Sequence, residues 1–213
     1  MEQLERLEPL ELSNIMSSSA HELRRNIAQP SYWTFPEIAG RFIEISASAD
    51  SASLTLAFRL VRETQQRGEP VGWVTSMKSF FYPPDVALVG VDLAALAIIR
   101  VCHGTSIPRA GEKLLRSGGF GLVVLDLGVV DIAVPLQSRL TGLAQHHHTG
   151  LVCLTEKQSK TFSLGSLVSL RVHAERRRSS ANRFACQLRV LKDKRRGPTW
   201  SHEELCHGPA GLC

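Results

Sequence analysis

Residues 46–55 combine small and hydroxyl side chains at the point where an apolar strand-like segment gives way to a helix-like one. A phosphate-binding loop, G-x-x-x-x-G-K-[ST], occupies such a position. Its glycines let backbone N–H groups surround the phosphates, and its lysine reaches the β and γ phosphates. Here Ala47 and Ala52 replace the glycines, Ser53 replaces the lysine and Leu54 replaces the hydroxyl residue. The pattern predicts a nucleotide-hydrolysing scaffold that has lost its catalytic loop.

Three other polar groups near expected element ends have both a chemical and a structural interpretation. Ser51 and Ser53 could bind phosphate weakly at a helix N-terminus, but capping of that helix is the favoured interpretation. Asp126 could be a relic metal ligand, but a polar strand end is favoured. Residues 146–148 are consecutive histidines, which point in different directions on a helix. We therefore expect a solvated helix end there rather than a metal site.

Positive charge gathers late in the chain, whose net charge is +5. The basic residues of two clusters are Arg176, Arg177, Arg178, Lys192, Lys194, Arg195 and Arg196. We expect the first cluster, Arg176–Arg178, to lie in a hairpin turn between two strands. That turn is either a solvated loop or a contact with DNA phosphates or an acidic protein surface. Net charge permits such partners without proving them.

The order of elements predicts an α/β fold. Apolar runs and amphipathic segments alternate from residue 35 to residue 155, whereas three strand-like segments follow without helices between them. The expected strands are 41–46, 71–75, 95–101, 122–127, 151–155, 167–173, 184–193 and 203–207, and the expected helices are 53–67, 85–90, 107–117 and 135–145. This order predicts a mainly parallel sheet flanked by helices, with antiparallel strands at its C-terminal edge.

The chain divides into an expected N-terminal helical arm, 1–30, and one domain, 31–213. The arm either packs on its own domain or docks on a neighbouring protein, and so allows self-association. Five scattered cysteines without C-x-x-C spacing make a zinc site improbable. The acidic start is unlike a signal peptide, and no run approaches the ~20 apolar residues that cross a membrane. We therefore expect a cytoplasmic protein.

Four segments in order resemble the RecA core, the ATPase domain of recombinases. Residues 40–45 resemble the strand before its phosphate loop, and residues 89–93 the segment after its second strand. Residues 116–126 resemble its Walker B region, and residues 190–194 the strand tip that carries lysines to a neighbour's ATP. The resemblance covers Gly40 to about Leu212 and implies a RecA-like core.

The departures from that family bear on activity. Met77 stands where the family's water-activating glutamate would be, and a thioether cannot accept a proton. Glu156 replaces a polar sensor glutamine. Asp126 alone survives, and it cannot hold Mg²⁺ without the loop hydroxyl and phosphates. The stretches that correspond to two DNA-gripping loops, 128–135 and 156–165, are short. The resemblance thus implies no enzyme activity, no cofactor and a doubtful grip on single-stranded DNA.

A RecA-like core with a degenerate nucleotide site is similar to the ImuA proteins of bacterial mutagenesis cassettes. That resemblance implies a nucleoid-associated accessory role in damage-induced (SOS) mutagenesis and translesion DNA synthesis. The implied partners are RecA, the inactive Y-family polymerase homologue ImuB and, indirectly, an error-prone DNA polymerase III α-subunit. Lys192 and Lys194 would face the ATP of a RecA subunit. Two alternatives stay open, namely a DNA-binding module that uses the late basic hairpins and a residual NTPase.

Overall fold

The computed structural model describes residues 32–48, 52–79, 86–87, 89–180 and 183–207. The chain separates into two compact units, Met1–Tyr32 and Trp33–Cys213, and all of the secondary structure below belongs to the second. The expected arm 1–30 lies outside the described residues, as do residues 85 and 88 of the expected helix 85–90, in which 86–87 are helical and 89–90 form a turn.

One sheet of eight strands organises the described part of the chain, in the order β3-β2-β4-β5-β1-β6-β7-β8. The strands are β1 Phe42–Ser46, β2 Val71–Ser76, β3 Leu96–Val101, β4 Leu122–Gly128, β5 Gly150–Thr155, β6 Leu170–Ser180, β7 Arg183–Asp193 and β8 Ser201–His207. The pairs from β3 to β6 are parallel, and β6–β7 and β7–β8 are antiparallel. The expected fold class is confirmed.

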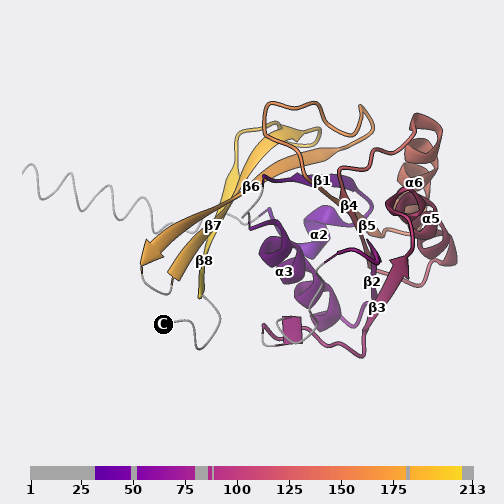
Figure 1. Ribbon diagram of the computed structural model, residues 1–213, viewed down its shortest axis with the longest axis horizontal. Helices are drawn as coiled ribbons and strands as arrows, with labels where there is room; N and C mark the ends of the chain where they lie inside the picture. The colour runs from indigo at the N-terminus through magenta and orange to yellow at the C-terminus, as the bar shows by residue number, and fades with distance from the viewer. Residues whose placement is uncertain (1–31, 49–51, 80–85, 88, 181–182, 208–213) are drawn as a thin grey trace, which may run out of the picture. The chain divides into compact units, whose positions relative to one another are not determined.

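Helices cover both faces of the sheet (Figure 1). They are α2 Phe35–Ile38, α3 Ser53–Gln66, α5 Ile107–Ser117 and α6 Val134–His146, with a 3-10 turn at Gly104–Ser106. The helices α5 and α6 lie together on one face, and α3 lies on the other. The helix α5 has the bounds expected from the sequence because Pro108 suits its first turn and Gly118 ends it in the left-handed conformation, φ 68°.

Burial is deepest in the central strands, where every residue of β1 and β5 is buried. This is the pattern of parallel strands covered on both faces, and it explains their unbroken apolar runs. Among the described residues, no helix is long and apolar enough to span a membrane.

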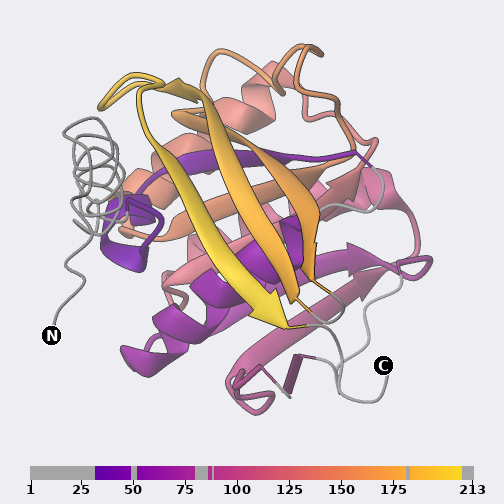
Figure 2. The same cartoon turned by 90° about the vertical axis from the view of Figure 1, so that its left-hand side faces the viewer.

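The strand directions create two distinct edges. The carboxyl edge is where the parallel strands end and α3 begins. The amino edge is where the parallel strands start. It also holds the turn after β7, because β7 runs antiparallel to β6 and its last residue, Asp193, pairs with Leu170 at the start of β6. The long strands β6, β7 and β8 cross the molecule between the two edges (Figure 2).

Candidate functional site: a nucleotide-site remnant and two basic segments

The remnant of the phosphate loop lies at the carboxyl edge, between β1 and α3. Ala47 and Ala52 are buried, and the Ala47 amide donates a hydrogen bond to the Thr155 carbonyl oxygen on β5, 3.0 Å away. The side chain of Leu54 is exposed on the first turn of α3. Of the loop residues that the structure describes, none is a glycine or a cation, so these residues lack the glycines and the lysine of a working phosphate loop.

The helix α3 starts without a side-chain cap. Its N-cap is Ala52, whose methyl group accepts no hydrogen bond, and Ser53 is the first helical residue. The expectation that Ser53 caps this helix is wrong, and Ser51 lies outside the described residues. The first-turn amides of α3 therefore receive no hydrogen bond from a capping side chain.

Asp126, on β4, is occupied by hydroxyl groups of its own chain. Thr75 Oγ1 and Ser79 Oγ each donate to Asp126 Oδ2 over 2.7 Å. Met77, between these two donors in sequence, exposes its side chain and donates its amide to the Val101 carbonyl. The geometry supports the interpretation of Asp126 as a polar strand end.

Glu44, on β1, is a buried carboxylate that the sequence analysis did not single out. Its Oε1 accepts a hydrogen bond from Thr155 Oγ1 at 3.1 Å, and its Oε2 accepts from the Ser163 hydroxyl and, at 3.0 Å, from the Leu164 amide. Burial, and then the Glu44 charge, raise the pKa of the Cys153 thiol on the neighbouring strand well above its ordinary value. In the sequence, the signal for Glu44 was a single acidic residue within an apolar strand.

Arg171, on β6, binds the same segment from the other side. Its Nη1 donates to the Thr161 carbonyl at 2.6 Å, and its Nε lies 3.6 Å from Glu44 Oε2. Gln137 Nε2 adds bonds to the Ile132 and Leu164 carbonyls, at 2.7 and 2.8 Å. These bonds fasten the stretch 156–165 to the core.

The two short stretches expected from the sequence also contact each other. The Glu156 amide donates to the Gly128 carbonyl at 2.8 Å, and Lys157 Nζ lies 2.7 Å from Asp131 Oδ1. These two bonds tie the two stretches to each other.

The second basic segment, residues 192–196, is built on a buried carboxylate. Asp193 accepts hydrogen bonds from Arg41 Nη2 at 2.7 Å, from the Arg195 amide at 2.9 Å and from Trp200 Nε1 at 3.0 Å. Burial acts to raise the pKa of Asp193, but the bonds from Arg195, Trp200 and Arg41 outweigh it and lower that pKa. The Arg41 and Asp193 side chains are 2% and 0% exposed, so the segment has a rigid base.

The cations of this segment differ in their partners. Arg196 binds both carboxylate oxygens of Glu37 on α2, at 2.6 and 2.9 Å, and Lys192 Nζ donates to the Ser166 carbonyl at 3.2 Å. Burial, and then the charge of Lys194, lower the pKa of Lys192. Within the described part of the chain the exposed Lys194 side chain has no hydrogen bond or ion pair.

The first basic segment is not a turn. Arg176, Arg177 and Arg178 lie on β6, paired with Cys186, Ala185 and Phe184 of β7, which corrects the expectation of a hairpin loop. All three arginines are exposed, and the Arg176 guanidinium lies over the Phe184 ring at 5.2 Å. A strand holds successive side chains on alternate faces, so these three cations do not form a single row.

The two basic segments lie at opposite ends of the β6–β7 hairpin. Seven residues of β6 separate Arg178 from Arg171, the pairing partner of Lys192, or roughly 23 Å at the ordinary rise of a strand. The two segments are therefore separate parts of the surface. The helix α6 ends at His146, so the expected helix end is confirmed. Among the described residues, no cluster of His, Cys, Asp and Glu could hold a metal ion.

Comparison with known proteins gives partial matches to bacterial RecA. The chain is 31% identical to Protein RecA of Fusobacterium nucleatum over 87 residues, which cover 41% of this chain and 23% of that protein. It is 30% identical to Protein RecA of Clostridium beijerinckii, covering 53% and 30%, and 29% identical to that of Thermotoga petrophila, covering 53% and 35%. The matches thus span about a third or less of those relatives. No family model matches the chain. These similarities support a distant relationship to the RecA-like superfamily.

Proposed function

We propose, from this distant relationship to RecA-like proteins, that the chain is a non-catalytic accessory factor of damage-induced mutagenesis. It would act through protein contacts with RecA and with an ImuB-like polymerase homologue, and through them on an error-prone DNA polymerase III α-subunit. The role is that of the ImuA proteins in translesion synthesis. It requires a partner surface and no turnover of nucleotide.

The observation that carries this proposal is the state of the carboxyl edge. Hydrolysis needs a phosphate cradle, a metal-binding set and a base for water. Here the cradle residues are the buried alanines 47 and 52, Asp126 accepts two internal hydroxyl bonds, and an exposed thioether, Met77, stands in the place of a base. Each such loss typically costs orders of magnitude in rate.

The amino edge supplies the candidate contact with RecA. Lys192 and Lys194 flank Asp193, whose bonds to Arg41 and Trp200 hold the turn in place. Two ammonium groups carried by such a turn suit the phosphates of ATP bound to another subunit, because opposite charges within a few ångströms attract strongly when partly desolvated. Lys194 lacks a described partner and is available for that contact.

Calorimetric titration with ATP and Mg²⁺ tests the first half of the proposal. We expect no heat of binding at micromolar to millimolar nucleotide. Micromolar affinity would contradict the assignment of a lost site and favour a residual NTPase.

Capture of purified RecA in the presence of ATP tests the second half. Lys192→Ala with Lys194→Ala is expected to weaken capture at least tenfold, since two charge contacts of about 1 kcal/mol each are lost. The matched control is Lys78→Ala with Lys160→Ala, which removes two exposed lysines elsewhere. Equal capture by the two double variants would remove the basic turn from the proposal.

Affinity capture from cells with damaged DNA tests the cellular role. We expect RecA and a Y-family polymerase homologue to be recovered together with the wild-type chain. Recovery of neither protein would contradict an accessory role in translesion synthesis.

A further inference from the structure

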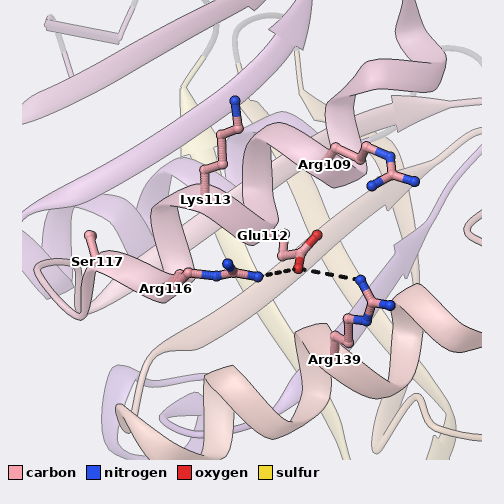
Figure 3. Close-up of a pocket in the computed structure, with 6 residues that line it drawn as sticks. All are labelled: Arg109, Glu112, Lys113, Arg116, Ser117 and Arg139. Atoms are coloured by element: carbon pink, nitrogen blue, oxygen red, sulfur yellow. Dashed lines mark hydrogen bonds and ion pairs between the residues drawn. The ribbon is translucent and has the colours of Figure 1, made fainter.

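An open groove of about 570 Å³ lies between α5 and α6, away from the nucleotide-site remnant and from both basic segments. Figure 3 shows the residues that line it. They are Arg109, Glu112, Lys113, Arg116 and Ser117 from α5, and Arg139 from α6. The groove is far larger than a single ion requires, so it suits an extended ligand.

The charge of this groove is strongly one-sided. Arg109, Lys113 and Arg116 follow one another at i, i+4 and i+7, which places them on one face of α5. Arg139 faces them from α6, a helix whose sequence contains no acidic residue. With Glu112 as the single carboxylate among the lining residues, the groove carries a net charge of +3.

Glu112 holds two of the cations in place. Its buried Oε1 accepts a hydrogen bond from Arg116 Nη2 at 2.8 Å and lies 3.9 Å from Arg139 Nη1. Arg109 and Lys113 extend away from that carboxylate (Figure 3). Both are exposed, and neither has a hydrogen bond or ion pair to another described residue. The groove therefore combines two positioned guanidinium groups with two cations that have no counter-charge.

The lining favours a phosphate backbone over a protein surface. Protein interfaces depend on a few buried aromatic or large apolar anchors, and none of the exposed large hydrophobic residues in the described chain lines this groove. Single-stranded nucleic acid is gripped mainly by aromatic stacking, and the lining contains no aromatic ring. A lining that offers cations without aromatic rings suits the nucleic acid with the highest density of phosphate charge, which is a duplex.

We propose that the α5–α6 groove binds the sugar-phosphate backbone of duplex DNA without reading its sequence. From Arg109 to Arg116 the helix rises about 10 Å, and a duplex presents about six phosphate charges over that length. The site is distinct from the proposed contact with RecA, which uses Lys192 and Lys194. It would place the protein on DNA near the polymerase that it serves.

The salt dependence of binding tests the proposal, with a fluorescently labelled 20-bp duplex and the full chain. Four phosphate contacts predict that the association constant falls about 150-fold between 50 and 200 mM salt. Arg109→Gln with Lys113→Gln removes two contacts and no intrachain bond, and the fall is then expected to be about 12-fold. Lys78→Gln with Lys160→Gln is the matched control and is expected to behave as the wild type.

Five outcomes would overturn the proposal. One is the absence of salt-dependent binding by the wild-type chain, and another is an equal loss in the control variant. A third is a 20-nucleotide single strand that binds as tightly as the duplex, or a poly-glutamate peptide that binds in the duplex's place. The last is a loss caused by Arg177→Gln with Arg178→Gln while the groove variant binds normally, which would assign DNA binding to β6.

Discussion

Buried carboxylates have different roles at the carboxyl edge of the sheet and in the turn at its amino edge. At the carboxyl edge, Asp126 and Glu44 accept hydrogen bonds from hydroxyl and amide groups of their own chain, and no cation is directed outward by them. At the amino edge, Asp193 is equally internal, but its bonds fix a turn whose neighbours Lys192 and Lys194 carry positive charge toward solvent.

The carboxylates at the first edge stabilise the core, whereas the carboxylate at the second edge supports a charged part of the surface. At the first edge the carboxylates accept hydrogen bonds from polar groups of the core. At the second edge a buried ion pair forms a rigid base next to the exposed Lys194. Each prediction below breaks or sharpens this contrast, in order of decreasing effect.

The largest expected effect is the loss of Asp193. Asp193→Ala leaves the Arg41 guanidinium, 2% exposed, buried without its counter-charge. Removal of one partner of a buried ion pair costs about 3–5 kcal/mol, so the free energy of unfolding should fall by that amount in a denaturant titration. A loss below 1 kcal/mol would show that the turn has no rigid base.

Acidification should destabilise the antiparallel end of the sheet before it affects Asp193. Burial, and then the Arg59 charge, lower the pKa of His202 on β8 to about 4. In the unfolded chain His202 binds a proton below its ordinary pKa of 6.5, whereas in the folded chain it binds one only near pH 4. The free energy of unfolding therefore falls as the pH drops from 6.5 to 4. Asp193, whose pKa is lowered, contributes to stability above its ordinary pKa of 3.8. That contribution is lost only as the pH falls below 3.8.

The expected loss over that window is at most roughly 3 kcal/mol, since each pKa unit corresponds to about 1.4 kcal/mol. Unfolding measured at pH 7, 5.5 and 4.5 checks it. In His202→Gln the slope should shrink to the part that His173 contributes, because burial also lowers the pKa of His173. An unchanged slope in the variant would contradict the assignment.

Glu44→Gln should weaken the fastening of the stretch 156–165. The amide nitrogen cannot accept a hydrogen bond from Ser163 or Leu164, and Arg171 loses its counter-charge. An unmet buried polar group costs about 1–3 kcal/mol, and limited proteolysis within this stretch should become faster. Glu156→Gln, at an exposed site, is the control and should be cleaved at the wild-type rate.

The smallest expected effect on stability comes from Glu37→Ala. Its ion pair with Arg196 is partly exposed, and such pairs contribute less than about 1 kcal/mol. The variant removes the ion pair between Arg196 and Glu37, leaves the bond from Arg195 to the main-chain carbonyl of residue 37, and adds one net positive charge beside the turn. If the turn contacts RecA, capture of RecA should increase, and a decrease would favour α2 itself as part of the contact.

The sequence predicted the order and nature of the elements because local signals control them. The helix 107–117 was placed without error, since a proline and two glycines mark its ends. Arg176–Arg178 was misplaced because β6 runs on after its apolar alternation stops, held by pairing with Phe184–Cys186. Glu44 and Asp193 could not be assigned their roles because Thr155, which bonds Glu44, and Arg41, which pairs with Asp193, lie more than 100 residues away from them.

The bond from Arg41 to Asp193 joins positions 152 residues apart and has a consequence for synthesis. A ribosome adds about 5–20 residues per second, so the guanidinium emerges roughly 8–30 seconds before its acceptor. During that interval, burial of the first strand would also bury the Arg41 guanidinium without the Asp193 carboxylate that neutralises it. The nascent protein is thus expected to close its sheet late, when the last three strands arrive.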